Sequence, residues 1–192
     1  MILVTGGIGA GKSVVCRVLR LSGFPVFDCD YEARRIMDSS AAIKDFLNAE
    51  ISTEIIDENG DVRKDKLRAE IFADEVKREK LNHVVHQGVR DKLREFISEN
   101  GADCFVESAI PHTGRLLQFA DEVWIVDAPR EVRISRVVER NGLSEREIVK
   151  IMETQQAEFD EVKKSGIPYR MIFNDLNHDL SNEIFANLKK KN

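Results

Sequence analysis

The chain has 192 residues, of which 42% are hydrophobic and 33% charged, and its formal net charge is −5. This size and balance are typical of one compact globular domain, and the negative charge argues against a protein that coats nucleic acid with a basic surface. The three cysteines lie far apart without a Cys-x-x-Cys pair, which indicates neither a disulfide framework nor a thiolate zinc site. The chain shows no secretory signal and no long apolar run, so we expect a cytoplasmic protein without a membrane partner.

Five short apolar runs predict buried strands at residues 2–4, 24–27, 104–106, 123–126 and 171–173. The segments between them have helical spacing, and this alternation predicts the α/β class, with a parallel sheet flanked by helices. We expect a single domain over residues 1–192 whose core comprises about 1–38, 102–128 and 160–192. The Lys189-Lys190-Lys191 ending is interpreted as the terminus of a last helix.

The interval between the second and third runs is long enough to hold an inserted helical lobe, at about residues 39–101. Two helical stretches are expected in it, at residues 43–50 and roughly 65–99, with a turn at residues 57–60 between them. The apolar residues of the longer stretch fall near one face, which predicts packing in a core rather than a cofactor site.

The first run leads directly into a complete phosphate-binding loop, Gly6-Gly7-Ile8-Gly9-Ala10-Gly11-Lys12-Ser13. Glycines let the backbone turn tightly and aim its N–H groups at phosphate oxygens. Lys12 supplies a positive charge for the terminal phosphates, and Ser13 supplies a hydroxyl ligand for Mg²⁺ at the start of a helix. The loop therefore predicts binding of a nucleoside triphosphate with Mg²⁺.

The second run ends in Asp28 and Asp30, at the sheet edge where ligands of α/β proteins bind. We assign Asp30 as the base for an acceptor hydroxyl and Asp28 as an acidic partner of the metal; capping of the next helix is the alternative for either acid. Arg34 lies one helical turn beyond Asp30 and could hold an anionic group of the acceptor. An ion pair between Asp30 and Arg34 within the helix is equally compatible.

Two further acids follow apolar runs. Glu107 precedes a loop with room to approach a ligand, and we favour it as the residue for metal or substrate. Asp127 precedes Ala128-Pro129, a typical helix start, and is interpreted as a cap. Only one of the two acids need be functional.

Residues 129–141 carry four arginines, and Arg133, Arg136 and Arg140 share one helix face. Such a helix could place positive charge over the phosphates and exclude water, as a lid does. A solvated face balanced by Glu131 and Glu139 is the alternative. His83 and His86 lie three apart in a helix without partner ligands, so no metal site is expected there, and His86 either contacts substrate or packs.

Together these residues resemble the dephospho-coenzyme A kinase family. The family's opening is similar to residues 5–13, and its Asp-x-Asp with an Arg four residues later matches Asp28, Asp30 and Arg34. Further family motifs match in the same order: Leu-Asn and His, a Glu after a strand, two lid arginines, a later Gln and a final Asn. The residues of this chain that carry these matches are Leu81, Asn82, His86, Glu107, Arg136, Arg140, Gln155 and Asn174. The chain departs from the family pattern at Gln87, where a proline is usual, and at Arg133, where a glutamine is usual.

The resemblance implies a P-loop kinase with a five-stranded parallel sheet, a helical substrate lobe and a helical lid at about residues 129–158. It implies transfer of the terminal phosphoryl group of ATP to the ribose 3′-hydroxyl of dephospho-coenzyme A, with Mg²⁺. A kinase for another small hydroxylated metabolite, or a nucleotide-binding switch without catalysis, is the alternative.

The roles that the resemblance implies fall into four groups. Catalysis involves Asp30, Lys12, Arg136 and Arg140. ATP binding involves Gly7, Ile8, Gly9, Ala10, Gly11, Lys12, Ser13, Val14, Arg136 and Asn174. Substrate binding involves Thr5, Asp30, Arg34, His86 and Glu107, and metal binding involves Ser13 and Asp28. The partners are then small molecules, and no nucleic acid or membrane is expected.

Overall fold

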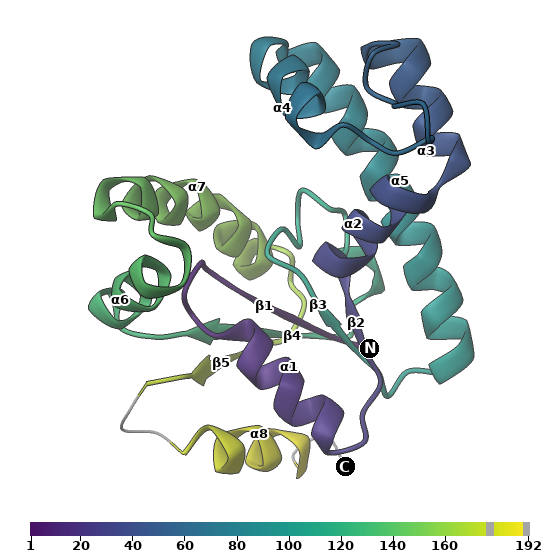
Figure 1. Cartoon of the computed structure of the whole chain (residues 1–192). Coiled ribbons are helices and arrows are strands. Elements are labelled where there is room, and N and C mark those ends of the chain that lie inside the picture. Colours follow the sequence, from purple (N-terminus) through teal and green to yellow (C-terminus); the bar gives the residue numbers. More distant parts are fainter. Residues whose placement is uncertain (176–178, 190–192) are drawn as a thin grey trace. The chain divides into compact units, whose positions relative to one another are not determined.

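The structure is a computed structural model that describes residues 1–175 and 179–189 (Figure 1). Its five strands form one parallel sheet in the order β2-β3-β1-β4-β5. The strands are β1 (Ile2–Gly6), β2 (Val26–Asp28), β3 (Phe105–Glu107), β4 (Glu122–Asp127) and β5 (Tyr169–Phe173). The predicted α/β class and the five predicted strands are thus confirmed, with ends that shift by one or two residues.

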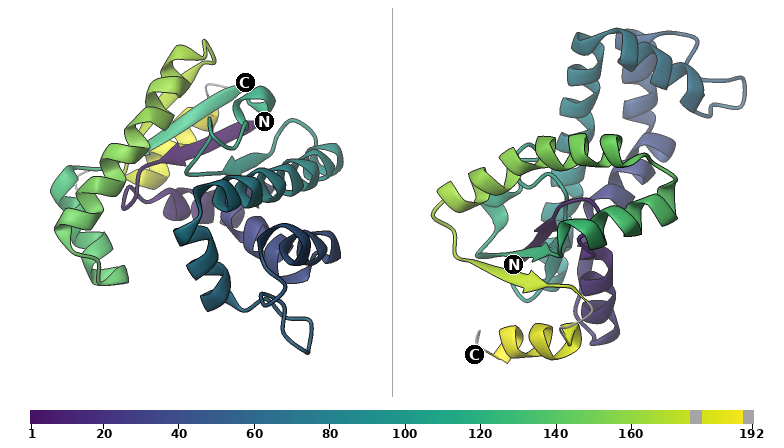
Figure 2. Two further views of the ribbon diagram at one scale, coloured as in Figure 1. Left: turned by 90° about the horizontal axis from the view of Figure 1, so that it is seen from above. Right: turned by 90° about the vertical axis from the view of Figure 1, so that its left-hand side faces the viewer.

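The central strands β3, β1 and β4 are mostly buried, as expected for parallel strands with crossover helices. Helices α1 (Lys12–Leu21) and α8 (Leu180–Lys189) lie on one face, and α7 (Glu145–Lys164) lies on the other (Figures 1 and 2). On the α1 side, Ile2 and Val4 pack with Val15, Leu19 and other apolar residues of one core cluster. Residues 190–191 of the lysine-rich ending lie outside the described residues, and α8 ends at Lys189.

The register places acidic residues at the carboxyl edge of the sheet. Asp28 of β2 pairs with Glu107 of β3, and Glu107 pairs with Val4 of β1. On the other side of β1, Gly6 pairs with Val126, one residue before Asp127. The loop that follows β1 therefore leaves the sheet between Glu107 and Asp127.

Two compact units make up the chain, one of residues 1–28 and 97–192, the other of residues 29–96. The second unit contains α2 (Cys29–Ser39), α3 (Ala41–Phe46), a π-helical turn (Leu47–Ile51), α4 (Lys64–Ala73) and most of α5 (Glu75–Asn100). The helical unit thus begins ten residues before the expected residue 39, because Ile36 of α2 packs against α5 at Gly88, where a Cβ would lie 3.3 Å from it. The division into one kinase domain with a lobe and a lid stays a prediction.

The long helix expected at residues 65–99 is wrong, because Asp74 divides it into α4 and α5. Asp74 has extended backbone, and its carboxylate accepts hydrogen bonds from the N–H groups of Val76 and Lys77 at 2.9 and 3.1 Å. This side chain caps the start of α5 and satisfies two of its unpaired donors. The expected turn at residues 57–60 is present, closed by a hydrogen bond from Gly60 N to Asp57 O.

Candidate functional site

The phosphate loop joins β1 to α1, and three of its glycines have backbone conformations that other residues rarely adopt. Gly6, Gly9 and Gly11 have φ of 154°, 76° and 98°. The loop closes on itself through a hydrogen bond from Ala10 N to Gly7 O, and Lys12 Nζ donates to Gly6 O at 2.8 Å. The loop is thus folded in a tight form, which suits an anion.

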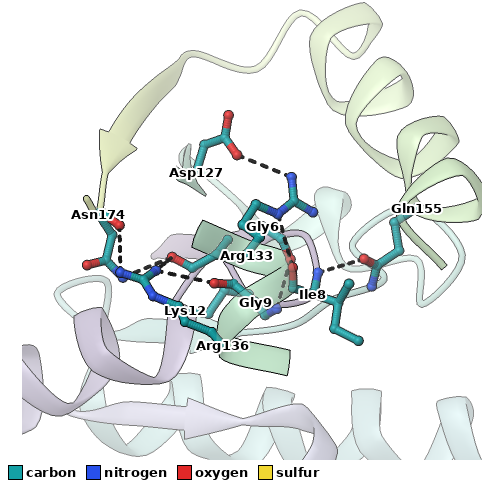
Figure 3. Close-up of polar contacts among 10 residues, drawn as sticks. Gly6, Ile8, Gly9, Lys12, Asp127, Arg133, Arg136, Gln155 and Asn174 are labelled. Carbon is teal, nitrogen blue, oxygen red and sulfur yellow. Dashed lines mark hydrogen bonds and ion pairs between the residues drawn. The ribbon is translucent and has the colours of Figure 1, made fainter. Parts of the chain in front are cut away.

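Side chains from distant parts of the chain hold the carbonyl groups of this loop (Figure 3). Arg133 Nε donates to Ile8 O at 3.0 Å, and Asn174 Nδ2 donates to Ala10 O at 2.9 Å. Arg136 lies between them, donating to Gly9 O at 3.3 Å and to Ala10 O at 3.5 Å, and also to Asn174 O at 3.0 Å. We call Arg133, Arg136 and Asn174 the carbonyl clamp.

The carbonyl clamp determines where the loop's N–H groups point. In a trans peptide the C=O and N–H groups of one unit point in opposite directions. Donation to Ile8 O therefore orients the N–H of Gly9, and donation to Ala10 O orients the N–H of Gly11. The clamp binds the outer face of the loop and leaves its N–H face toward the side where phosphate is expected.

Two helices carry residues that contact the loop, α6 (Arg130–Asn141) and α7. Arg133 and Arg136 lie on α6, and Gln155 lies on α7, where its Oε1 accepts a hydrogen bond from Ile8 N at 2.7 Å. The peptide before Ile8 is thereby held from one helix and the peptide after it from the other. The helix pair expected as a lid is thus bound directly to the loop in this structure.

Arg133 has an ionic partner at the end of β4. Its Nη1 lies 3.3 Å from Asp127 Oδ1, and its side chain is only 14% exposed. Burial lowers the pKa of Arg133 and Asp127 opposes this, yet a guanidinium remains charged at any physiological pH. Asp127 does not cap α6 as interpreted from the sequence: the residue at the N-cap is Pro129, and no side chain caps the helix. The Asp127 carboxylate pairs with the guanidinium of Arg133 instead.

Glu107 lies at the same edge in a partly apolar setting. Burial raises its pKa, the neighbouring Asp28 carboxylate adds to this, and the thiol of Cys16 opposes it by donating a hydrogen bond. Burial also raises the pKa of Cys16, so the thiol keeps its proton. Glu107 Oε2 and Thr5 Oγ1 are both buried without a hydrogen-bond partner. Unsatisfied buried oxygens are uncommon, and two of them at one sheet edge mark a place for a polar ligand.

Comparison with known proteins covers nearly the whole chain. The dephospho-CoA kinase family model matches residues 1–176. The chain belongs to the dephospho-CoA kinase family. It is 35% identical over 170 residues to a dephospho-CoA kinase of Porphyromonas gingivalis, covering 88% of this chain and 83% of that one.

Solved structures share the fold of this chain. TT1252 of Thermus thermophilus superposes with a TM-score of 0.77 at 29% identity, covering 99% of this chain and 94% of that one. A dephospho-CoA kinase of Campylobacter jejuni superposes with a TM-score of 0.70 over 99% of this chain and 96% of that one. At 18% identity, the second likeness shows the fold alone. The P-loop kinase fold is thus confirmed.

Not all residues of the dephospho-CoA kinase pattern lie at the loop. Arg136 and Asn174 contact it directly, whereas Arg140 is exposed and donates to Asn141 Oδ1 at 2.8 Å. The last turn of α6 thus extends beyond the loop in this structure. A role of Arg140 toward ATP stays a prediction.

The acceptor residues expected for a dephospho-CoA kinase lie mainly in the helical unit. Asp30 is exposed in the first turn of α2, and Arg34 is exposed one turn later. Among the described residues Asp30 and Arg34 form no ion pair with one another; the pair on this helix joins Arg35 to Glu32 at 2.9 Å. Arg34 also lines a groove of about 340 Å³ in this unit. His86 is half-buried on α5.

A carboxylate that sequence reasoning missed links α7 to the loop after β3. Glu158 is only 7% exposed and accepts hydrogen bonds from the N–H groups of His112 and Thr113, at 2.7 and 3.2 Å, and from the Thr113 hydroxyl. An acid in the middle of a charged helix normally indicates a solvated face. No local signal distinguishes this one, because its partners lie 45 residues away in sequence.

The oxygen atoms that the chain offers as ligands suit Mg²⁺. Within the described ranges, no three His, Cys, Asp or Glu side chains gather in a metal-binding group. Mg²⁺ needs no such cage, since it takes most of its ligands from phosphates and water and few from the protein. The exposed hydroxyl of Ser13 at the start of α1 and the half-buried carboxylate of Asp28 suit this pattern. Separately, the described helices include none with the length and apolar character to span a membrane.

Proposed function

We propose that this protein transfers the terminal phosphoryl group of ATP to the ribose 3′-hydroxyl of dephospho-CoA, giving CoA and ADP. The observation that carries the proposal is a complete phosphate loop, held by lid residues, in a chain that the dephospho-CoA kinase family model matches from residue 1 to 176. The nucleotide-binding part and the family thus agree on the reaction class. Its partners are then small molecules, and a cytoplasmic location stays a prediction.

For ATP, the loop provides N–H donors and the lid provides cations. Residues 7–14 wrap the phosphates, with Lys12 as the charge for the terminal groups. Arg136 and Asn174 hold the loop and lie next to the nucleotide, and Arg140 reaches the phosphates when the lid closes. The release of Arg140 from Asn141 costs little, because it is an exposed contact.

For the acceptor, Asp30 takes the proton of the 3′-hydroxyl as the oxygen attacks phosphorus. An exposed carboxylate with no ion pair to Arg34 among the described residues is available for this. Arg34 and His86 bind polar groups of the acceptor, and the groove beside Arg34, lined also by Met37, Val62 and Leu67, suits a long and partly apolar substrate. Thr5 and Glu107 offer their unpaired oxygens to the acceptor.

Ser13 and Asp28 would hold Mg²⁺. The ion, when bound, neutralises charge on the phosphate oxygens. Asp28 would bind the ion either directly or through a water molecule. Its neighbour Glu107 lies at the same edge, and burial raises the pKa of that carboxyl.

An assay that couples ADP release to a detectable signal tests the proposal. We expect turnover with dephospho-CoA and much slower turnover with nucleoside monophosphates, shikimate and gluconate. Turnover of one of these alcohols without turnover of dephospho-CoA would identify a different P-loop kinase. Tight ATP binding with no phosphorylation of any acceptor would identify a nucleotide-dependent switch.

Asp30→Asn tests the assignment of the base in the same assay. The amide keeps the shape of the side chain but cannot take the proton, so we expect a fall in kcat of ~10²–10⁴-fold. The affinity for a non-hydrolysable ATP analogue should stay unchanged. Asp45→Asn, an exposed aspartate on α3 outside the groove beside Arg34, is the matched control. Wild-type turnover of the Asp30 variant would remove Asp30 from this role.

A further inference from the structure

One side chain of the carbonyl clamp is explained neither by the phosphates nor by the closing of a lid. Arg133 Nε donates to Ile8 O and its Nη1 pairs with Asp127 (Figure 3). Its Nη2 lies against Gly7, and the side chain is only 14% exposed. These contacts place the guanidinium at the backbone of the phosphate loop, where it can act on the peptide groups of the loop.

The fit between Arg133 and the loop is close enough to exclude side chains. A Cβ at Gly7 would lie 2.0 Å from Arg133 Nη2, and a Cβ at Gly9 would lie 2.4 Å from Arg133 O. Gly9 also has φ of 76°, which alone favours glycine, but Gly7 has no such backbone requirement. An alanine at position 7 would therefore push the end of the Arg133 side chain away from the loop.

The contact has a direct consequence for phosphate binding. Because Ile8 O and Gly9 N belong to one trans peptide, the donor on Ile8 O orients the Gly9 N–H toward the opposite side, into the loop. Asp127 keeps the donor in place, since a guanidinium with a fixed carboxylate partner loses little freedom when it makes a further bond. A donor that is oriented in advance binds a phosphate oxygen without a cost of reorganisation.

We propose that Arg133, anchored by Asp127 and packed on Gly7, is a positioning residue that orients the Gly9 N–H for phosphate binding without itself touching the nucleotide. This inference rests on the proposed function for the identity of the phosphates as those of ATP. It differs from a role of Arg133 as a lid cation, because it requires Gly7 and Asp127 to act through the same side chain.

Binding of a non-hydrolysable ATP analogue with Mg²⁺, measured by calorimetry, tests the inference. Arg133→Ala removes a charged donor, so we expect affinity to fall roughly ten- to a hundredfold. Gly7→Ala should weaken binding by displacing the guanidinium. In the double variant the alanine at position 7 meets no guanidinium, so its affinity should lie within about threefold of Arg133→Ala alone.

A second pair tests the anchor outside the loop. Asp127→Asn should weaken binding of the analogue, and adding it to Arg133→Ala should cause no further loss. Arg146→Ala, which removes the same charge from an exposed position on α7, is the matched control and should bind as the wild type does. The thermal midpoint of every variant shows whether it is folded. If Gly7→Ala does not fold, Asp127→Asn, alone and combined with Arg133→Ala, tests the inference.

Two results would overturn the inference. If Arg133→Ala binds the analogue as the wild type does, Arg133 positions nothing. If the losses from Gly7→Ala and Arg133→Ala multiply in the double variant, Arg133 acts on the nucleotide independently of the loop. Because no acceptor is present, wild-type binding without turnover of dephospho-CoA would contradict the proposed function and leave this inference standing.

Discussion

Glu107 is a residue of the candidate site whose environment lowers the stability of the folded chain. Burial and the neighbouring Asp28 carboxylate raise the pKa of Glu107, and a hydrogen bond from the Cys16 thiol opposes this rise. A group that ionises less readily in the folded state than in the unfolded state lowers stability as the pH rises from the unfolded pKa through the folded one. Such local conflicts at functional sites are common in enzymes.

Glu107→Gln should therefore raise the thermal midpoint. The amide cannot ionise and can still accept from Cys16, so we expect a higher midpoint than in the wild type at pH 7. The gain should shrink as the pH falls toward 4 and the carboxyl takes up a proton in both states, and turnover with dephospho-CoA should fall. Thermal unfolding of both proteins across this pH range is the measurement. An equal difference in midpoint at pH 4 and pH 8 would show that ionisation of Glu107 is not the cause.

Among the elements, α7 has contacts at both ends of the site. Gln155 binds the phosphate loop at Ile8, and Glu158, one turn later, binds the backbone of residues 112 and 113. One helix thus contacts both the loop after β1 and the loop after β3. The first loop is predicted to bind ATP, and the second follows Glu107.

Glu158→Ala should loosen the loop after β3. The change removes the acceptor of two part-buried backbone N–H groups, at a cost of about 0.5–1.5 kcal/mol for each hydrogen bond. We expect a lower thermal midpoint and faster hydrogen exchange of the His112 and Thr113 amides. Glu161→Ala is the matched control, because Glu161 pairs with Lys164 at the surface of the same helix. Unchanged exchange at both amides would show that other contacts hold this loop.

At the scale of the whole molecule, patterns that are local in sequence predicted most of the fold. The phosphate loop, the five strands and the acids at their ends follow from short runs whose meaning depends on neighbours in sequence. The break at Asp74 was missed, although an aspartate is a good N-cap, because apolar spacing continues across it. The start of the helical unit at Cys29 was missed because Ile36 finds its partner, Gly88, only in the folded chain.

The site was harder to predict than the fold, for a physical reason. The hydrogen bonds of the carbonyl clamp join residues 125 to 164 apart in sequence, apart from the one between Arg136 and Asn174. A repeat of arginines on one helix face indicates charge, but not whether the charge binds phosphate or a backbone carbonyl. Asp127 illustrates this: its position before a proline suggested a cap, and its partner is Arg133.

Nucleotide binding should stabilise the molecule as a whole. A ligand that binds only the folded state at 100 times its Kd adds about 2.7 kcal/mol to the free energy of unfolding. For a chain of this length that corresponds to a rise in midpoint of about 5–10 °C. We expect this rise with the ATP analogue and Mg²⁺ for the wild type and its loss in Lys12→Ala. A full shift in the variant would contradict the assignment of the loop.

The carbonyl clamp also bears on how the chain is made. The ribosome releases the phosphate loop well before Arg133, Arg136 and Asn174 have been synthesised. Until they arrive, the carbonyl groups of residues 8–10 lack these donors, and the N–H groups of the same peptides are not yet oriented. A nascent chain that ends before α6 carries the whole motif without any residue of the carbonyl clamp. The motif is therefore translated long before the residues that hold it.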